Sequence, residues 1–210
     1  MNIDVPLTKM LDLYVKFDSA SNILCSDAIK EFLELIFLEK PKLFQSLYFK
    51  KGSTQALHQD PTYVVVDKFP HNLIAVWVAL EDINQGSGEL VYILGSHTKL
   101  IFRYKNNKIN WDLHEDGNEM HHHHIHCLKE MAKELTLTQF LPKKGDILFW
   151  HANLVHGGSQ IENEDLTRKS IVGHFCPASN IPKYFKNDNN RYVSETNGID
   201  IVSMYYNKCG

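Results

Sequence analysis

The sequence has 210 residues and is 43% hydrophobic, which is enough for one well-buried core and short for two domains. Aromatic residues are plentiful, with 11 Phe, 9 Tyr and 3 Trp, so intrinsic disorder is not expected. The formal net charge is −3 and no long basic run is present. This balance argues against nucleic acid or an acidic membrane surface as the main partner.

The N-terminal residues, the apolar stretches and the cysteines bear on the cellular compartment. Residues 1–10 lack a charged start followed by an apolar run, so no secretory signal is expected. The sequence contains no stretch of about 18 apolar residues, so no membrane span is expected. The four cysteines are scattered and include no C-x-x-C pair. These features predict a reduced, cytoplasmic protein.

Residues 27–39 have the apolar spacing of an amphipathic helix. Asp27 lies near the start, where a carboxylate favours the helix dipole, and Pro41 follows the end. We expect this helix to pack on a sheet and to carry no chemistry.

After Pro41 the hydrophobic period shortens to that of strands. The segments rich in β-branched and aromatic residues are 43–49, 54–58, 62–67, 73–80, 89–94, 135–141, 146–151 and 169–176. Glycine- and proline-containing turns separate them. Eight short strands with regular turns predict a mainly β fold, a double-sheet jelly roll or barrel, with its β core at about 43–177. We expect a single domain over 1–210, in which 181–210 forms a tail wrapped on the surface.

Residues 97–134 interrupt this rhythm as a polar insertion. The insertion predicts a helix at roughly 120–133 and is typical of a lid or binding loop between strands. It contains His121–His124 and His126. His122 and His126, one helical turn apart, could bind a second metal, but we favour a solvated, histidine-rich helix.

His58 and Asp60 are the first candidates for chemistry. On a strand, residues two apart point to the same side, and Pro61 would end the strand there. His156 is the candidate third ligand, since Gly157 and Gly158 allow close backbone approach or a tight bend beside a metal. His151 competes with His156 for this role.

The strand that follows has an inward face that begins with Arg168 and Ser170. A guanidinium matches a carboxylate through two parallel hydrogen bonds, so Arg168 would suit the far carboxylate of an organic co-substrate. A surface ion pair with Glu162 or Glu164 is the alternative. Two histidines and one carboxylate are the ligands that hold a non-haem Fe(II) and leave coordination positions open.

These motifs together resemble the phytanoyl-CoA dioxygenase family. The similarity runs in order from about residue 43 to 177 and comprises HQD at 58–60, AVWVALED at 75–82, GSGELVYILGSH at 86–97, GDILFWHANLVHGGSQ at 145–160 and RKSIVGHF at 168–175. The resemblance implies a double-stranded β-helix (jelly-roll, cupin-like) fold with flanking helices and an inserted lid at 97–134. It also implies an enzyme that uses Fe(II), 2-oxoglutarate and O2.

By this resemblance His58, Asp60 and His156 bind iron, and Arg168 binds the 2-oxoglutarate carboxylate with Ser170 beside it. The residues Gln59, Tyr63 and Trp77 match family positions near the co-substrate or pocket. Related halogenases lack the carboxylate, so Asp60 favours hydroxylation of a small molecule. Two alternatives stay open: a non-catalytic jelly-roll binding protein, and a cupin-type enzyme that uses Zn or Mn without 2-oxoglutarate.

Overall fold

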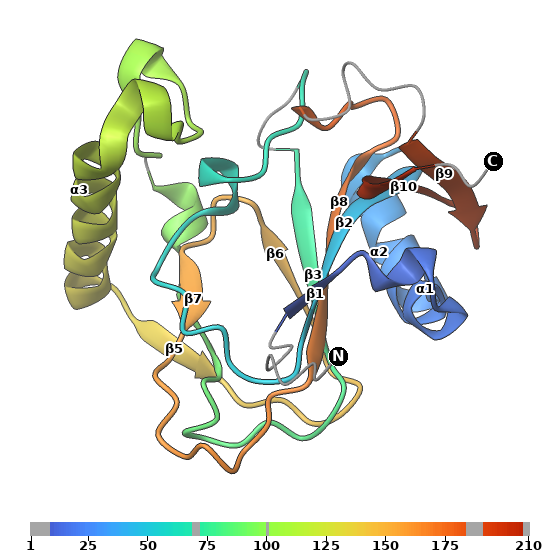
Figure 1. The fold of residues 1–210 in the computed structure, drawn as a ribbon, viewed down its shortest axis with the longest axis horizontal. Helices are drawn as coiled ribbons and strands as arrows, with labels where there is room; N and C mark the ends of the chain where they lie inside the picture. The colour runs from blue at the N-terminus through green and yellow to red at the C-terminus, as the bar shows by residue number, and fades with distance from the viewer. Residues whose placement is uncertain (1–8, 69–71, 100, 184–190, 208–210) are drawn as a thin grey trace, which may run out of the picture.

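A computed structural model describes residues 9–68, 72–99, 101–183 and 191–207. Two facing sheets form its centre, and helices cover the outer face of each (Figure 1). The helices are α1 (Asp18–Leu24), α2 (Asp27–Phe37) and α3 (Leu113–Glu134), with 3-10 turns η1 (Leu13–Val15), η2 (Asp60–Thr62), η3 (Ser96–Thr98) and η4 (Lys105–Asn107). The described residues contain no helix that is long and apolar enough to cross a membrane.

The larger sheet has the strand order β6-β3-β8-β2-β10-β9, with β1 paired to β2. Its strands are β1 (Lys9–Leu11), β2 (Pro41–Phe49), β3 (Ile74–Ala79), β6 (Ile147–His151), β8 (Ser170–Pro177), β9 (Arg191–Thr196) and β10 (Ile199–Asn207). The smaller sheet has the order β5-β4-β7, formed by β5 (Leu137–Phe140), β4 (Leu90–Ile93) and β7 (His156–Gly158). This architecture confirms the predicted mainly β, jelly-roll fold.

Strand β3 shows how the sequence divides the core. Ile74, Val76 and Val78 face α1 and α2, in a cluster with Leu24, Ile29 and Leu33. The alternate residues Ala75 and Trp77 face the smaller sheet. Because side chains alternate along a strand, one apolar hexapeptide supplies both layers, which is why it reads as a continuous hydrophobic run.

Three of the predicted elements are wrong. The segments 54–58 and 62–67 are not strands: apart from isolated bridges at His58 and Val66, they form loops and the turn η2. In 62–67 the β-branched Val64 and Val66 pack in a cluster with Phe44 and Leu73 rather than pair, since β propensity largely reports packing, whereas residues 54–56 are exposed. The predicted surface tail is also wrong where it is described. Strand β10 pairs with β2, and Ile199 and Ile201 are buried by their alternation.

The insertion forms a longer helix than predicted. Helix α3 begins at Leu113, capped by Asp112, and is kinked at Gly117. Its buried Leu128 packs with Ile93 and Val155 on the outer side of the smaller sheet. Figure 1 shows α3 on the side of the molecule opposite α1 and α2.

Candidate metal centre and its cavity

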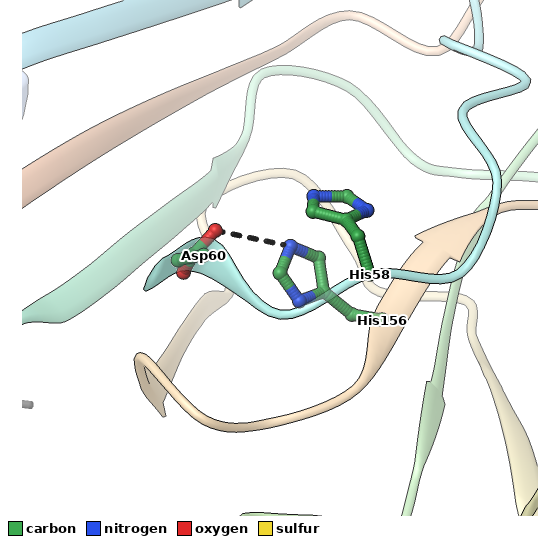
Figure 2. Close-up of side chains that lie close together, drawn as sticks. All are labelled: His58, Asp60 and His156. Carbon is green, nitrogen blue, oxygen red and sulfur yellow. Dashed lines mark ion pairs between the residues drawn. The ribbon is translucent and has the colours of Figure 1, made fainter. Parts of the chain in front are cut away.

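His58 and His156 are brought together by a two-residue antiparallel bridge. The amide of His58 donates to the carbonyl of His156 (2.9 Å), and the amide of His156 donates to the carbonyl of His58 (3.0 Å). Their rings then lie side by side, with centroids 4.3 Å apart (Figure 2). Residues 98 positions apart in the chain therefore meet through backbone pairing.

Glycines in β7 make this approach possible. A Cβ on Gly157 would lie 2.8 Å from the carbonyl oxygen of Gln55, and one on Gly158 would lie 2.9 Å from the amide nitrogen of Thr54. Real Cβ atoms almost never approach that closely, so the loop carrying His58 passes over β7 only because side chains are missing there.

Asp60 reaches the two imidazoles from the first position of η2, where its amide donates to the carbonyl of Ala152 (3.0 Å). The prediction that His58 and Asp60 share one face of a strand is wrong, although their side chains do converge. An isolated bridge places His58, and a 3-10 turn beginning next to Pro61 places Asp60. The separation of two residues still suits convergence, because the chain turns between them.

The three side chains form a buried ligand set. One atom from each of His58, Asp60 and His156 lies within 4.8 Å of the others, and all three residues are buried. The Oδ1 atom of Asp60 is 3.5 Å from Nε2 of His156, as the dashed line in Figure 2 marks. The described residues contain no other such group of three or more metal-binding side chains.

Backbone carbonyls select the tautomer of both imidazoles. The Nδ1 atom of His58 is 2.9 Å from the carbonyl of Ala56, and that of His156 is 2.9 Å from the carbonyl of Leu154. A carbonyl only accepts, so each Nδ1 carries a proton, and in a neutral imidazole the free lone pair is then on Nε2. Hydrogen bonds of this kind orient metal-binding histidines.

Electrostatics favour the metal-binding protonation states of two of the ligands. Burial lowers the pKa of His58 to about 3, and the neighbouring His156 contributes in the same direction. Burial alone would raise the pKa of Asp60, but His156 and His174 outweigh it, so the net pKa lies below its usual value. A neutral imidazole and an ionised carboxylate are the forms that bind a cation.

Arg168 lies in the same cavity as a buried cation without an acidic partner. The side chain is 2% exposed, and its guanidinium carbon is 5.1 Å from the ring centroid of Phe49 and 5.9 Å from that of Trp77. Burial lowers the pKa of Arg168 to about 10, and Glu89 opposes that shift. Among the described residues, no carboxylate forms an ion pair with Arg168, so the predicted alternative of a surface pair does not occur.

Two further donors near Arg168 are buried without a partner. The Nε of Arg168, the indole nitrogen of Trp77 and the hydroxyl of Ser170 make no hydrogen bond with any residue that the structure describes. Buried polar groups are rarely left unpaired, and two of these donors belong to Arg168 and Trp77, which line one cavity and are available to an acceptor ligand there. A carboxylate would satisfy a guanidinium and the neighbouring hydroxyl or indole donors.

A cavity of about 560 Å³ connects the ligand set to Arg168. His58, Asp60, His156 and Arg168 all line it, together with Tyr63 and Trp77. Its remaining wall is apolar or uncharged over most of its area, apart from Lys9 and His174. The volume lies in the range of small-molecule sites.

Other predicted residues lie outside this cavity, among them Ser170, which is buried two residues from Arg168 but does not line it. Gln59 is buried, but its amide nitrogen donates to the carbonyl of Asn153 (2.7 Å) and the residue does not line the cavity. His151 lies on β6, where its Nδ1 accepts from the amide of Asn153 (3.1 Å). None of the described residues of the insertion 97–134 lines the cavity either.

The expectation of a solvated histidine cluster on α3 is wrong for His121 and His124. His124 is 2% exposed and stacks on Phe102, while His121 is half-buried and stacks on Trp111. His122 and His126 are exposed, as that interpretation requires.

Sequence reasoning missed two residues beside Asp60. The indole nitrogen of Trp150 donates to Oδ2 of Asp60 (2.9 Å), which leaves Oδ1 facing the imidazoles. The Nε2 of His174 lies 3.7 Å from Oδ1. Strand parity was the available signal for His174, because it shares the inward face of β8 with Ser170 and Val172. No local signal pairs Trp150 with Asp60.

Sequence comparison places these features in a known family. The profile of the phytanoyl-CoA dioxygenase (PhyH) family matches residues 14–170. The human peroxisomal phytanoyl-CoA dioxygenase is 32% identical over 134 residues, covering 61% of this chain and 35% of that protein. Phytanoyl-CoA dioxygenase 1 of Oryza sativa subsp. japonica is 29% identical over 125 residues, covering 56% and 39%. The matched region thus spans little more than a third of these relatives.

Solved structures share the fold. EctD from S. alaskensis, crystallised with 2-oxoglutarate and 5-hydroxyectoine, superposes with a TM-score of 0.63 at 16% identity, covering 82% of this chain and 57% of that one. The non-haem α-ketoglutarate-dependent carbocyclase SnoK from nogalamycin biosynthesis gives 0.61 at 15% identity, covering 82% and 64%.

Proposed function

We propose that this chain, which belongs to the phytanoyl-CoA dioxygenase family, is an Fe(II)- and 2-oxoglutarate-dependent dioxygenase, because it keeps a complete ligand set. In this proposal it hydroxylates a small molecule and releases succinate and CO2. The observation that carries the proposal is one cavity lined both by His58, Asp60 and His156 and by a buried arginine that forms no direct ion pair with a described residue.

The residues present fit both groups. His58, Asp60 and His156 would hold the iron, since two imidazoles and one carboxylate are the facial ligand set of non-haem Fe(II) oxygenases. Arg168 would pair with the distal carboxylate of 2-oxoglutarate, with Ser170 and Trp77 as further donors. When bound, the iron and 2-oxoglutarate supply the oxidative chemistry that activates O2.

The protein supplies orientation and exclusion of water. The carbonyls of Ala56 and Leu154 direct the Nε2 atoms of the two histidines, and Trp150 occupies one oxygen of Asp60. Aromatic walls around Arg168 leave its charge poorly solvated, so a bound carboxylate gains more there than in water. The proposed small-molecule substrate would share the same cavity.

The buried arginine also supports this proposal over the two alternatives. A cupin-type Zn or Mn enzyme, or a binding protein without turnover, would need the ligand set but would leave Arg168 buried at a cost without a role. Both alternatives are therefore less favoured than a 2-oxoglutarate enzyme.

We propose further that 1–210 acts as one domain in the cytoplasm, with no nucleic-acid partner. The described cysteines Cys25, Cys127 and Cys176 are free thiols, which suits a reducing compartment. The near-neutral net charge supports the absence of a nucleic-acid partner.

Anaerobic titration with Fe(II) and 2-oxoglutarate tests the proposal. We expect a weak visible charge-transfer band that decays when O2 is admitted, with succinate as a product. Asp60→Ala should abolish the band, and Arg168→Ala should weaken 2-oxoglutarate binding, whereas His122→Ala on the exposed face of α3 should behave as wild type. Wild-type turnover by Asp60→Ala or Arg168→Ala would overturn the assignment. A metabolite panel screened by succinate release would then identify the substrate.

A further inference from the structure

The insertion 97–134 contacts the turn that carries the carboxylate ligand. The amide of Trp111 donates to the carbonyl of Thr62, the last residue of η2 (3.0 Å). The indole nitrogen of Trp111 in turn donates to the carbonyl of Gly117 at the kink of α3 (3.0 Å). The kinked start of α3 is thereby tied to η2, although the insertion contributes nothing to the cavity wall.

His121 is the side chain that extends this connection. Its ring stacks on Trp111, with centroids 4.3 Å apart and planes 17° apart. Its Nε2 is 3.2 Å from the hydroxyl of Tyr63, and its Nδ1 is 3.2 Å from the hydroxyl of Tyr104. A neutral imidazole has one N–H and one lone pair, so His121 uses both ring nitrogens between the two phenols.

Tyr104 continues the chain into the insertion. Its hydroxyl is 2.7 Å from Nδ1 of the buried His124, which stacks on Phe102. The Tyr104 hydroxyl therefore has two ring nitrogens within hydrogen-bonding distance, and its side chain also bonds that of Thr62 in η2. The contacts along Tyr63, His121, Tyr104 and His124 form one continuous network, in which a change at one side chain affects the others.

Tyr63 links this unit to the ligands. It lines the cavity, its amide donates to the carbonyl of Asp60 (2.9 Å), and its ring centroid is 5.5 Å from that of His58. A shift of the Tyr63 hydroxyl would therefore alter the surroundings of two of the three ligand-bearing residues, His58 and Asp60.

We propose that His121 is a positioning residue for the metal centre: it holds Tyr63 against His58 and so couples the insertion 97–134 to the ligand-bearing turn. This inference rests on the proposed function only in requiring a divalent cation at His58, Asp60 and His156. The insertion is therefore a brace for the site rather than a lid over it.

Cobalt(II) titration of the full chain without 2-oxoglutarate tests the coupling, because visible Co(II) bands report ligand geometry independently of turnover. Signal that persists in Asp60→Ala gives the contribution of sites that do not need this carboxylate, the surface histidines among them. The variant His121→Phe keeps a ring on Trp111 but makes no hydrogen bonds. We expect it to lower the Co(II) affinity by roughly tenfold, which is at the low end for residues that support metal ligands, and to change the Co(II) bands.

Tyr63→Phe removes the same hydrogen bond from the other side. Its loss should overlap with that of His121→Phe, which also removes the contact with Tyr104, so the double variant should lose clearly less affinity than the two single losses combined. His121→Gln, which restores a polar group near Nε2, should recover part of the affinity. His122→Phe, the same change one position along on the exposed face, is the matched control and should bind as wild type.

Each outcome bears on a separate claim. Wild-type affinity and bands in His121→Phe, or additive losses in the double variant, would overturn the coupling. If His121→Phe does not fold, Tyr63→Phe alone decides, since it leaves the stacking on Trp111 untouched. Failure of the wild-type chain to bind Co(II) at Asp60 would instead refute the metal centre, and with it the proposed function.

Discussion

Replacing Arg168 by Met should stabilise the protein in the absence of ligands while removing the co-substrate site. Burial lowers the pKa of Arg168 from its usual value to about 10. At about 1.4 kcal/mol per pKa unit, keeping the cation in the fold costs about 3 kcal/mol. Both the folded and the unfolded pKa lie far above 7, so this whole cost is present at neutral pH. Loss of the ring contacts with Phe49 and Trp77 removes roughly 1–2 kcal/mol in the other direction.

Urea denaturation of the metal-free Arg168→Met variant should therefore give a free energy of unfolding at least equal to wild type, and about 1–2 kcal/mol higher if Met fills the space. Calorimetric titration with 2-oxoglutarate, under anaerobic conditions with Fe(II), should show an affinity lower by about 100-fold or more, as expected when a buried charge pair is broken. Clear destabilisation of the metal-free variant combined with unchanged 2-oxoglutarate affinity would refute the reasoning, because Arg168 would then serve the fold.

Three other substitutions test separate parts of the structure. Trp150→Phe removes the donor to Oδ2 of Asp60 and should weaken Co(II) binding about tenfold, measured by titration; unchanged affinity would show that the bond does not orient the carboxylate. Gly157→Ala places a Cβ 2.8 Å from the carbonyl of Gln55, so it should lower the free energy of unfolding by about 1–3 kcal/mol and weaken Co(II) binding; a wild-type result in both assays would contradict the close packing. Burial raises the pKa of Asp12 from 3.8 to about 6, so its folded form favours the proton. The stability from that proton is fully present below about pH 3.8 and is lost as pH rises through 6. Asp12→Asn, in which the amide can still bond Ser46 and Ser203, should remove that part of the slope in urea denaturation between pH 4 and 7, and an unchanged slope would exclude Asp12 as its source.

The accuracy of the sequence predictions depended on how local each signal was. The strands at 43–49, 73–80, 89–94, 135–141, 146–151 and 169–176 correspond to β2, β3, β4, β5, β6 and β8, because their apolar period is a property of adjacent residues. Strand β10 was missed because its burial depends on parallel pairing with β2, more than 150 residues away in sequence. The segment 54–58 is not the predicted strand: it passes closely over Gly157 and Gly158 of β7 as a loop and pairs only through the bridge at His58.

By itself, the sequence determined which side chains are available for chemistry: two histidines, one aspartate and an arginine, in the order typical of one enzyme family. Only the tertiary structure decided how they meet. A two-residue bridge joins His58 to His156, η2 turns Asp60 toward them, and a cavity leaves Arg168 without an acidic partner. It also decided that His121 and His124 belong to a buried network. The physical reason is that hydrophobic period is encoded by neighbours in sequence, whereas tautomer, charge pairing and desolvation depend on groups that only folding brings together.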